Sequence, residues 1–292
     1  MRHSTGLPTA GLVGIVFQLT MSVSAATPDL ERARRFYERS EYGAALEILE
    51  ALSPKDGNVV LLIGQCYYMS GDAKAASTFL EKAVASDPRN PQFVLWLGRA
   101  DGRRAETANI LVAPSLAIKA RRNFVAAVRL DPRNMEAIGD LFEYYLDAPR
   151  LLGGGVDKAE ELVSRVRYLD VAEYHYELAR LAEKHKQFQA AEHQYRLAAG
   201  SAPNDPGRLI DLAEFFEAQG RRRESDEIFR RAREIAPQAP VVWFEQAKTY
   251  VASHRNIETA KALLKRYLSS SLTPQDPPRY EAKKLLRQIP DG

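Results

Sequence analysis

The sequence predicts an all-α fold in which about seven helix-turn-helix repeats stack side by side and one further helix covers the C-terminal end. A degenerate unit recurs about every 34 residues, as from Gly64 to Gly98 and from Pro203 to Pro237. Within each unit, apolar residues at three- and four-residue spacing give each helix one stripe to bury. Prolines then mark the boundaries between units, because proline interrupts a helix. A period of this length is typical of stacked helix pairs.

The second unit is the clearest copy of the pattern. Its residues are Val60-x2-Ile63-Gly64-x2-Tyr67, followed by Ala76-x3-Leu80, Ala83 and Pro88. This order matches the signature W-x2-L-G-x2-Y, A-x3-F, P. The chain therefore resembles the tetratricopeptide repeat (TPR) family. The resemblance implies a right-handed superhelical solenoid that holds a protein or peptide partner on an extended concave surface.

The other units keep the same order along the chain. The first has Ala33, Phe36, Ala45, Leu49 and Leu52; the third Val94, Leu97, Gly98, Ala120, Phe124, Ala127 and Pro132; the looser fourth Leu141, Tyr145, Ala159 and Val163; the fifth Leu178, Ala179, Ala182, Ala191, Tyr195, Ala198 and Pro203; the sixth Leu209, Leu212, Ala213, Phe216, Ser225, Phe229, Ala232 and Pro237; the seventh Trp243, Ala247, Tyr250, Ala260 and Leu264. The small residues stand where two helices approach closely. We expect the Asn-Pro and Asp-Pro boundaries to cap the helices that follow.

Three segments divide the chain. Residues 1–26 have the layout of a secretory signal peptide, with Arg2-His3, an apolar run over 11–23 and small residues ending at Ala26. The TPR array is expected over 27–268, and the capping helix, after a proline-rich turn, over 269–292. None of the seven asparagines begins an Asn-x-Ser/Thr sequon, which favours a bacterial exported protein, periplasmic or secreted. Retention of the leader as a membrane anchor is the alternative; after its cleavage we expect no membrane span.

The sequence offers no pattern for catalysis or for a cofactor. The five histidines form no H-E-x-x-H motif, and the single cysteine, Cys66, is expected to be a buried inert thiol. The run Gly153-Gly154-Gly155 before Lys158 lacks phosphate-loop spacing. The net charge of +3 gives no indication of nucleic-acid binding. We therefore expect a non-enzymatic protein, with no metal and no cofactor. An enzyme built on a helical array would need a polar cluster of shifted pKa values in a pocket.

Two repeats carry insertions in their inner turns, near 103–118 and 148–156. Inner turns of a solenoid emerge on one edge, and neighbouring repeats lie about 10 Å apart. We expect the two insertions to meet and to form one apolar surface beside the basic residues of the third repeat, suited to an apolar and acidic partner segment. Its apolar side chains are those of Ile110, Leu111, Val112, Leu151 and Leu152. The alternative is that these residues only cover the edge of the array.

The concave face is the second candidate surface. The TPR resemblance assigns it to the outward positions of each first helix, which here include Arg34, Tyr37, Gln65, Tyr68, Met69, Arg99, Arg103, Tyr176 and Arg180. The family's clamp for chaperone carboxy-termini needs Lys and Asn at such positions, whereas this chain has Arg34 and Gln65. The expected function is therefore that of an exported interaction scaffold other than a cytosolic co-chaperone. A membrane-tethered envelope assembly factor is the alternative.

Overall fold

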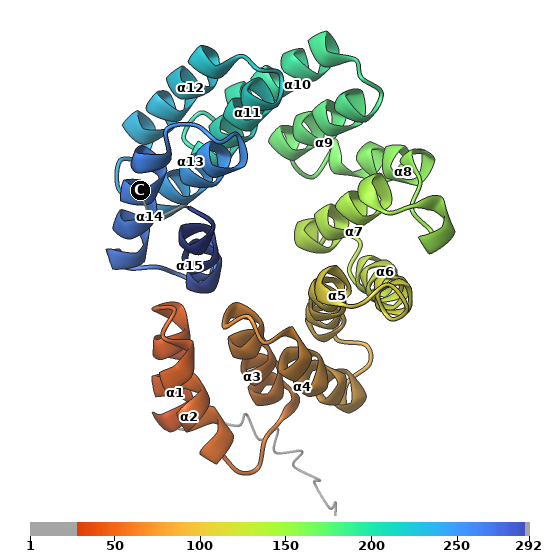
Figure 1. Ribbon diagram of the computed structural model, residues 1–292. Coiled ribbons are helices and arrows are strands. Elements are labelled where there is room, and N and C mark those ends of the chain that lie inside the picture. The colour runs from red at the N-terminus through yellow and green to blue at the C-terminus, as the bar shows by residue number, and fades with distance from the viewer. Residues whose placement is uncertain (1–27, 290–292) are drawn as a thin grey trace, which may run out of the picture.

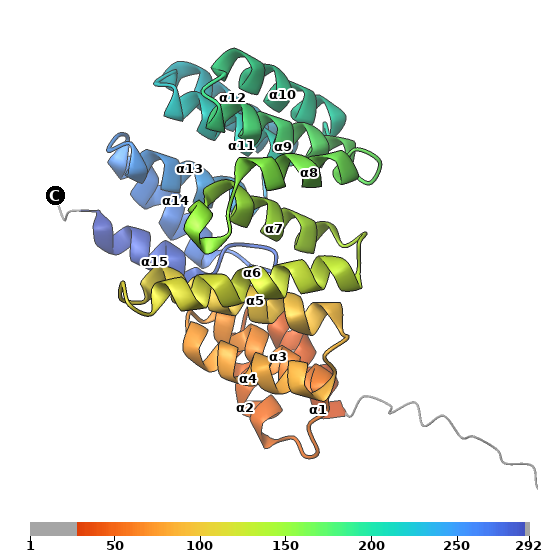
Figure 2. The same ribbon diagram turned by 90° about the vertical axis from the view of Figure 1, so that its right-hand side faces the viewer.

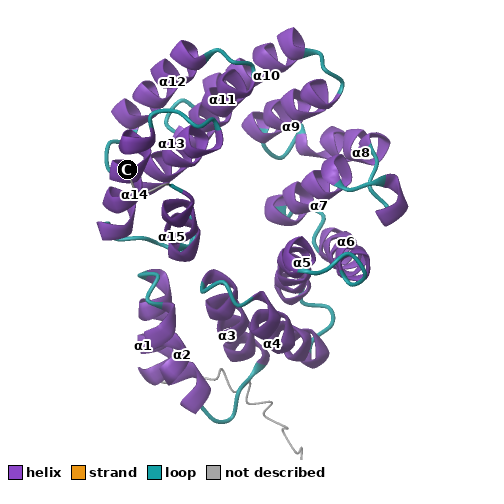
Figure 3. Cartoon of the chain, viewed as in Figure 1, coloured by secondary structure: helices purple, strands orange, loops and turns teal. Residues whose placement is uncertain are grey.

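Seven antiparallel helix pairs and a final single helix make up the structure (Figure 1). The computed structural model describes residues 28–289, and the expected signal peptide lies outside them. The pairs are α1 (Pro28–Glu38) and α2 (Tyr42–Ala51), α3 (Gly57–Met69) and α4 (Ala73–Ser86), α5 (Pro91–Thr107) and α6 (Ala113–Leu130), α7 (Met135–Asp147) and α8 (Val156–Val166), α9 (Val171–Lys184) and α10 (Phe188–Ser201), α11 (Pro206–Ala218) and α12 (Arg222–Ile235), and α13 (Pro240–Ala252) and α14 (Ile257–Ser269). Helix α15 (Arg279–Gln288) follows, and the described part of the chain contains no strand (Figure 3). The predicted fold class is confirmed.

The helix boundaries follow the capping residues that the sequence indicates. The Asn90 side chain accepts hydrogen bonds from the backbone N–H groups of Gln92 and Phe93 at the start of α5. Asn134 caps α7 in the same way, through the N–H of Ala137. Each cap satisfies amide groups that the first turn of a helix leaves without an intrahelical partner. The Pro-Arg-Asn segments therefore end one repeat and begin the next.

The apolar core runs along the array as a chain of local clusters, each built by adjacent repeats. One cluster joins α1, α2 and α3 through Ala33, Leu49 and Ile63, and another joins α13, α14 and α15 through Phe244, Tyr267 and Ala282. Each cluster is built largely from neighbouring helices, as expected when every repeat depends on the next one for burial. The array then curves, so that the first helices of the pairs line the inside and the second helices the outside (Figure 1).

The third repeat absorbs its insertion mainly by lengthening both of its helices. Helices α5 and α6 have 17 and 18 residues, whereas α3 and α4 have 13 and 14. The turn between them, 108–112, is short, and the Asn109 side chain accepts hydrogen bonds from the N–H groups of Leu111 and Val112. The expectation that the extra residues form a long inner turn is therefore wrong. Instead, the α5–α6 hairpin extends beyond its neighbours.

Glycines at the helix crossings give the first prediction. A Cβ atom at Gly98 would lie 2.8 Å from the Phe124 ring of α6, whereas one at Gly139 on α7 would meet nothing within 4 Å. We expect Gly98→Ala to lower the free energy of unfolding by about 1–3 kcal/mol through overpacking. Gly139→Ala should raise it by up to about 1 kcal/mol through helix propensity. Urea titration followed by circular dichroism measures both changes, and a stabilising Gly98→Ala would contradict this packing.

Candidate partner-binding surface

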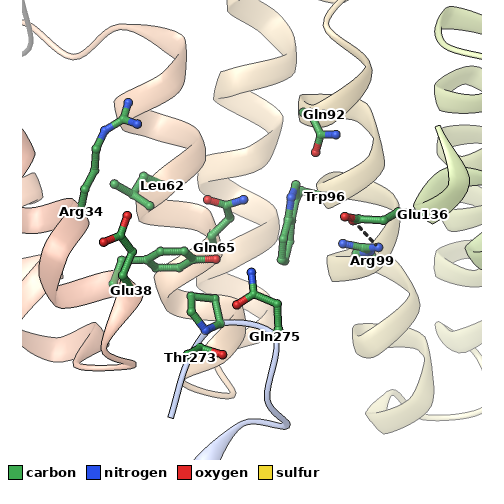
Figure 4. Close-up of a pocket in the computed structure, with 12 residues that line it drawn as sticks. Arg34, Glu38, Leu62, Gln65, Gln92, Trp96, Arg99, Glu136, Thr273 and Gln275 are labelled. Carbon is green, nitrogen blue, oxygen red and sulfur yellow. Dashed lines mark ion pairs between the residues drawn. The ribbon is translucent and has the colours of Figure 1, made fainter. Parts of the chain in front are cut away.

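The inside of the curved array holds a pocket of about 780 Å³ between its two ends. Its walls come from α1, α3, α5 and α7, and residues Thr273, Pro274 and Gln275 close one side (Figure 4). Four residues that the sequence places on the concave face line it, namely Arg34, Tyr37, Gln65 and Arg99. Helices from the first four repeats and the segment before α15 thus meet around one hollow.

Trp96 stands in the middle of this pocket. The Arg99 guanidinium stacks 4.9 Å from the centre of its ring, and Tyr68 meets the ring edge-on at 5.5 Å. In Figure 4 the amide groups of Gln65 and Gln275 lie on the opposite side of the ring from Arg99. The Trp96 ring remains partly exposed, so it presents an apolar surface to the pocket, and its contacts with Arg99 and Tyr68 fix its orientation.

Three primary amides surround the Trp96 ring. The side chains of Gln65, Gln92 and Gln275 line the pocket, and none of them makes a hydrogen bond to another described residue. Each amide carries both donors and an acceptor, which is the combination that a peptide bond also presents. The pocket therefore offers polar groups that match a peptide main chain.

The charges in the pocket differ in how far they are already paired. Arg99 forms ion pairs with Glu136 at 2.9 Å and Asp140 at 2.6 Å on α7. Arg34 is exposed and has no ion pair within residues 28–289. The sequence proposes both arginines for partner contact, but only Arg34 has its charge available.

Tyr68 and Arg103 lie under the C-terminal helix. The Arg103 guanidinium stacks on the Tyr68 ring at 5.6 Å and forms an ion pair with Glu281 of α15 at 3.0 Å. Beside them, Gly71 has a φ angle of +90°, and a Cβ atom at this position would lie 3.1 Å from the Tyr280 ring of α15. Helix α15 therefore covers the last repeat, as expected, and also closes the array against repeats two and three.

Tyr176 and Arg180 belong to a separate hollow of about 220 Å³ on α9 and α11. Arg180 forms an ion pair with Glu143 at 2.7 Å and donates a hydrogen bond to the Tyr176 hydroxyl. The same kind of pair recurs between successive first helices, from α9 to α11 as Glu173 with Arg208 and from α11 to α13 as Glu214 with Lys248 at 3.4 Å. This part of the concave face is thus occupied by its own ion pairs.

Two carboxyl groups near Arg208 have raised pKa values. Burial raises the pKa of Asp211 to about 7 and that of Glu177 to about 8, although Arg208 lowers both. Asp211 accepts a hydrogen bond from Arg208 at 3.1 Å, whereas neither oxygen of Glu177 has a hydrogen-bond partner among the described residues. Glu177 is fully buried, so its carboxyl group cannot reach a molecule in the pocket.

Met69 does not lie on the concave surface. It is buried against the core of the first two repeats, so its assignment as a contact residue is wrong. Met69 lies three residues after the buried Cys66, so the helical period places it on the buried face of α3. Cys66 is also buried there, and burial raises the pKa of its thiol to about 12, which keeps the thiol protonated.

The two insertions do not form the single apolar surface that the sequence suggests. The second insertion folds as a short 3-10 helix, η1 (Arg150–Leu152), which packs against the middle of α6 with Gly153 beside Arg121. The side chains of Ile110, Leu111 and Leu151 are 86%, 87% and 93% exposed, so they do not cover one another. Val112 is less exposed and Leu152 is half-buried. The reason is that the lengthened α5–α6 hairpin carries its tip away from η1.

Within residues 28–289, no helix is long and apolar enough to cross a membrane. The same residues contain no group of three or more His, Cys, Asp or Glu side chains arranged to hold a metal ion.

Comparisons with known proteins agree with this architecture. Two family models, each described as tetratricopeptide repeat, match residues 36–100 and 153–206. The chain thus contains tetratricopeptide repeats over these two segments. A search of curated proteins found no match. TPR arrays are generally protein-interaction scaffolds, which fits a concave face with an open pocket.

Solved structures share the fold at low sequence identity. A thermophilic TPR protein of Thermus thermophilus is 23% identical with a TM-score of 0.54, over 66% of this chain and 99% of that one. A TPR protein from Parabacteroides merdae is 14% identical with a TM-score of 0.56, over 89% of this chain and 97% of that one. These similarities concern the fold alone.

Sequence reasoning missed Gln92, Trp96 and Gln275. The first two lie four residues apart on α5, on the face that also carries Arg99, so the helical period that selected Arg99 could have found them. No local pattern indicates Gln275, because only the curvature of the whole array brings it to the pocket.

Glu177 gives the second prediction. Its pKa is raised to about 8 in the folded protein, above the usual carboxyl value, so the folded state binds an extra proton between these two pH values. Stability should therefore fall as the pH rises toward 8. Glu177→Gln removes this dependence, and its stabilising effect should grow from pH 5 to pH 8 and then level off. The exposed Glu47→Gln serves as the control in thermal unfolding, and parallel pH profiles for the two variants would refute the assignment.

Proposed function

We propose that this protein is a non-enzymatic scaffold that binds an extended peptide segment of a partner protein in the pocket around Trp96. The observation that carries the proposal is the group of three unpaired amides, from Gln65, Gln92 and Gln275, around one aromatic ring. The amides suit the donors and acceptors of a peptide main chain. Trp96 suits an apolar side chain of that peptide, as tryptophan often does at binding hot spots.

The charged side chains of the pocket indicate which kind of peptide it would bind. Arg34 has no ion pair within the described residues, and Glu38 also lines the pocket from the next turn of α1. Because Arg99 is held by Glu136 and Asp140, the arginine free to attract an acidic group of the partner is Arg34. A peptide with an apolar residue and a nearby carboxylate fits these positions.

Export of the protein is part of this proposal. The arrangement of a basic start, an apolar run over 11–23 and the small residues at Ala25 and Ala26 supports it. Retention of the leader would make the protein a membrane-tethered envelope assembly factor instead. N-terminal sequencing of the mature protein separates the two, because cleavage after Ala26 leaves Thr27 as the first residue.

The third prediction tests the pocket by site-specific crosslinking in cells. A benzoylphenylalanine at Leu62, which lines the pocket, should capture a partner, whereas the same group at Tyr168, which is 85% exposed on another part of the array, should not. Trp96→Ala should weaken capture at Leu62 about 30-fold, as expected for a loss of about 2 kcal/mol at a hot spot.

The matched control is Phe188→Ala, an exposed aromatic residue outside the pocket. Two results would place the binding surface elsewhere. One is that both crosslinker positions capture the same partner, and the other is that a folded Trp96→Ala variant captures it as well as the wild type does.

A further inference from the structure

The tip of the α5–α6 hairpin carries the most exposed run of apolar residues in the described part of the third repeat. Ile110 and Leu111 are 86% and 87% exposed, and Val112 next to them is 44% exposed. The stretch from Thr107 to Ile118 contains no charged residue. Large apolar side chains that stay exposed forgo the stabilisation that burial would give. Adjacent exposed side chains of this kind are typical of interaction sites in folded proteins.

Basic residues stand behind this tip. Lys119 and Arg122 follow on α6, and neither has an ion pair within residues 28–289. Lys119 is seven residues beyond Val112, which is about 10 Å along the helix axis. The uncharged tip is thus followed by its first cation, Lys119, at about the depth to which apolar side chains enter a membrane interface, about 5–10 Å.

The C-terminal helix adds further cations on the same side. The ion pair between Arg103 and Glu281, at 3.0 Å, holds the start of α15 beside the hairpin. Figure 2 shows that the end of α15 and the α5–α6 turn both reach the left side of the molecule. The exposed residues Lys283, Lys284 and Arg287 of α15 have no ion pair among the described residues. The acidic side chain closest in sequence to the tip is that of Glu106, which lies 3.8 Å from Arg103.

We propose that this edge docks on an anionic lipid surface. Ile110 and Leu111 enter the boundary between headgroups and acyl chains, and the cations of α6 and α15 contact the lipid phosphates. A projecting tip suits a fluid bilayer, because lipids rearrange around it, whereas a folded protein partner would need a matching groove. Charge complementarity favours anionic over neutral lipid. The surface lies outside the Trp96 pocket, so this inference and the peptide-binding proposal can fail independently.

Vesicle co-sedimentation tests this proposal, with the full chain and with the chain from Thr27 onward, so that the apolar run over 11–23 cannot mask the effect. We expect binding to vesicles that contain phosphatidylglycerol and little binding to phosphatidylcholine alone. Leu111→Asp should weaken binding about tenfold or more, since it replaces an apolar side chain by a charge that anionic lipid repels. Tyr168→Asp is the matched control, because Tyr168 is 85% exposed in the turn between α8 and α9, at the opposite edge of the array (Figure 2). It should bind as the wild type does.

A double substitution tests the cations of α6. Lys119→Glu with Arg122→Glu should weaken binding to phosphatidylglycerol vesicles by about fivefold or more per charge. Circular dichroism checks that each variant is folded. Absence of wild-type binding to both kinds of vesicle would overturn the proposal. So would binding by Leu111→Asp, or by Lys119→Glu with Arg122→Glu, that is as tight as binding by Tyr168→Asp. If the chain bound neither kind of vesicle and a crosslinker at Ile110 captured a protein, the tip would be a protein-binding site instead.

Discussion

Every repeat of this protein depends on the burial of a narrow apolar stripe against the next helix. A single pair such as α5 and α6 cannot cover its own stripe, and the neighbouring pair supplies the missing surface. Close approach at Gly98, where the Phe124 ring fills the space of a side chain, sets how the two helices of that pair cross. Since each crossing adds a small rotation, the local packing of many repeats determines the curvature of the array and brings its two ends together.

Ion pairs between first helices reinforce that curvature on the concave side. Arg99 with Glu136, Glu143 with Arg180, and further pairs along α9, α11 and α13 join successive repeats. A pair that is already satisfied offers little to an incoming charged group, because binding would have to break it. The pocket between the first four repeats and the segment before α15 differs from the rest of the inner face, because the amides of Gln65, Gln92 and Gln275 that line it are not paired within the described residues.

The sequence predicts the fold well, because each repeat carries its own local evidence. The spacing of residues such as Gly64 and Gly98, and the caps at Asn90 and Asn134, identify the helix pairs and their boundaries. The pocket is less predictable. Arg34, Tyr37 and Gln65 follow from helical periodicity, but Gln275 joins them only because the whole array curves back, which depends on contacts more than 200 residues apart in sequence.

The departures from the repeat explain where specific function can arise in such a regular structure. A strict solenoid presents similar surfaces along its length, so it cannot by itself distinguish one end from the other. Here the C-terminal helix returns to the second and third repeats through Glu281 and Tyr280, and it also contributes a wall to the Trp96 pocket through the segment before it. The same contact places the cations of α15 beside the lengthened α5–α6 hairpin. One closing interaction therefore shapes both surfaces, the inner pocket and the outer edge.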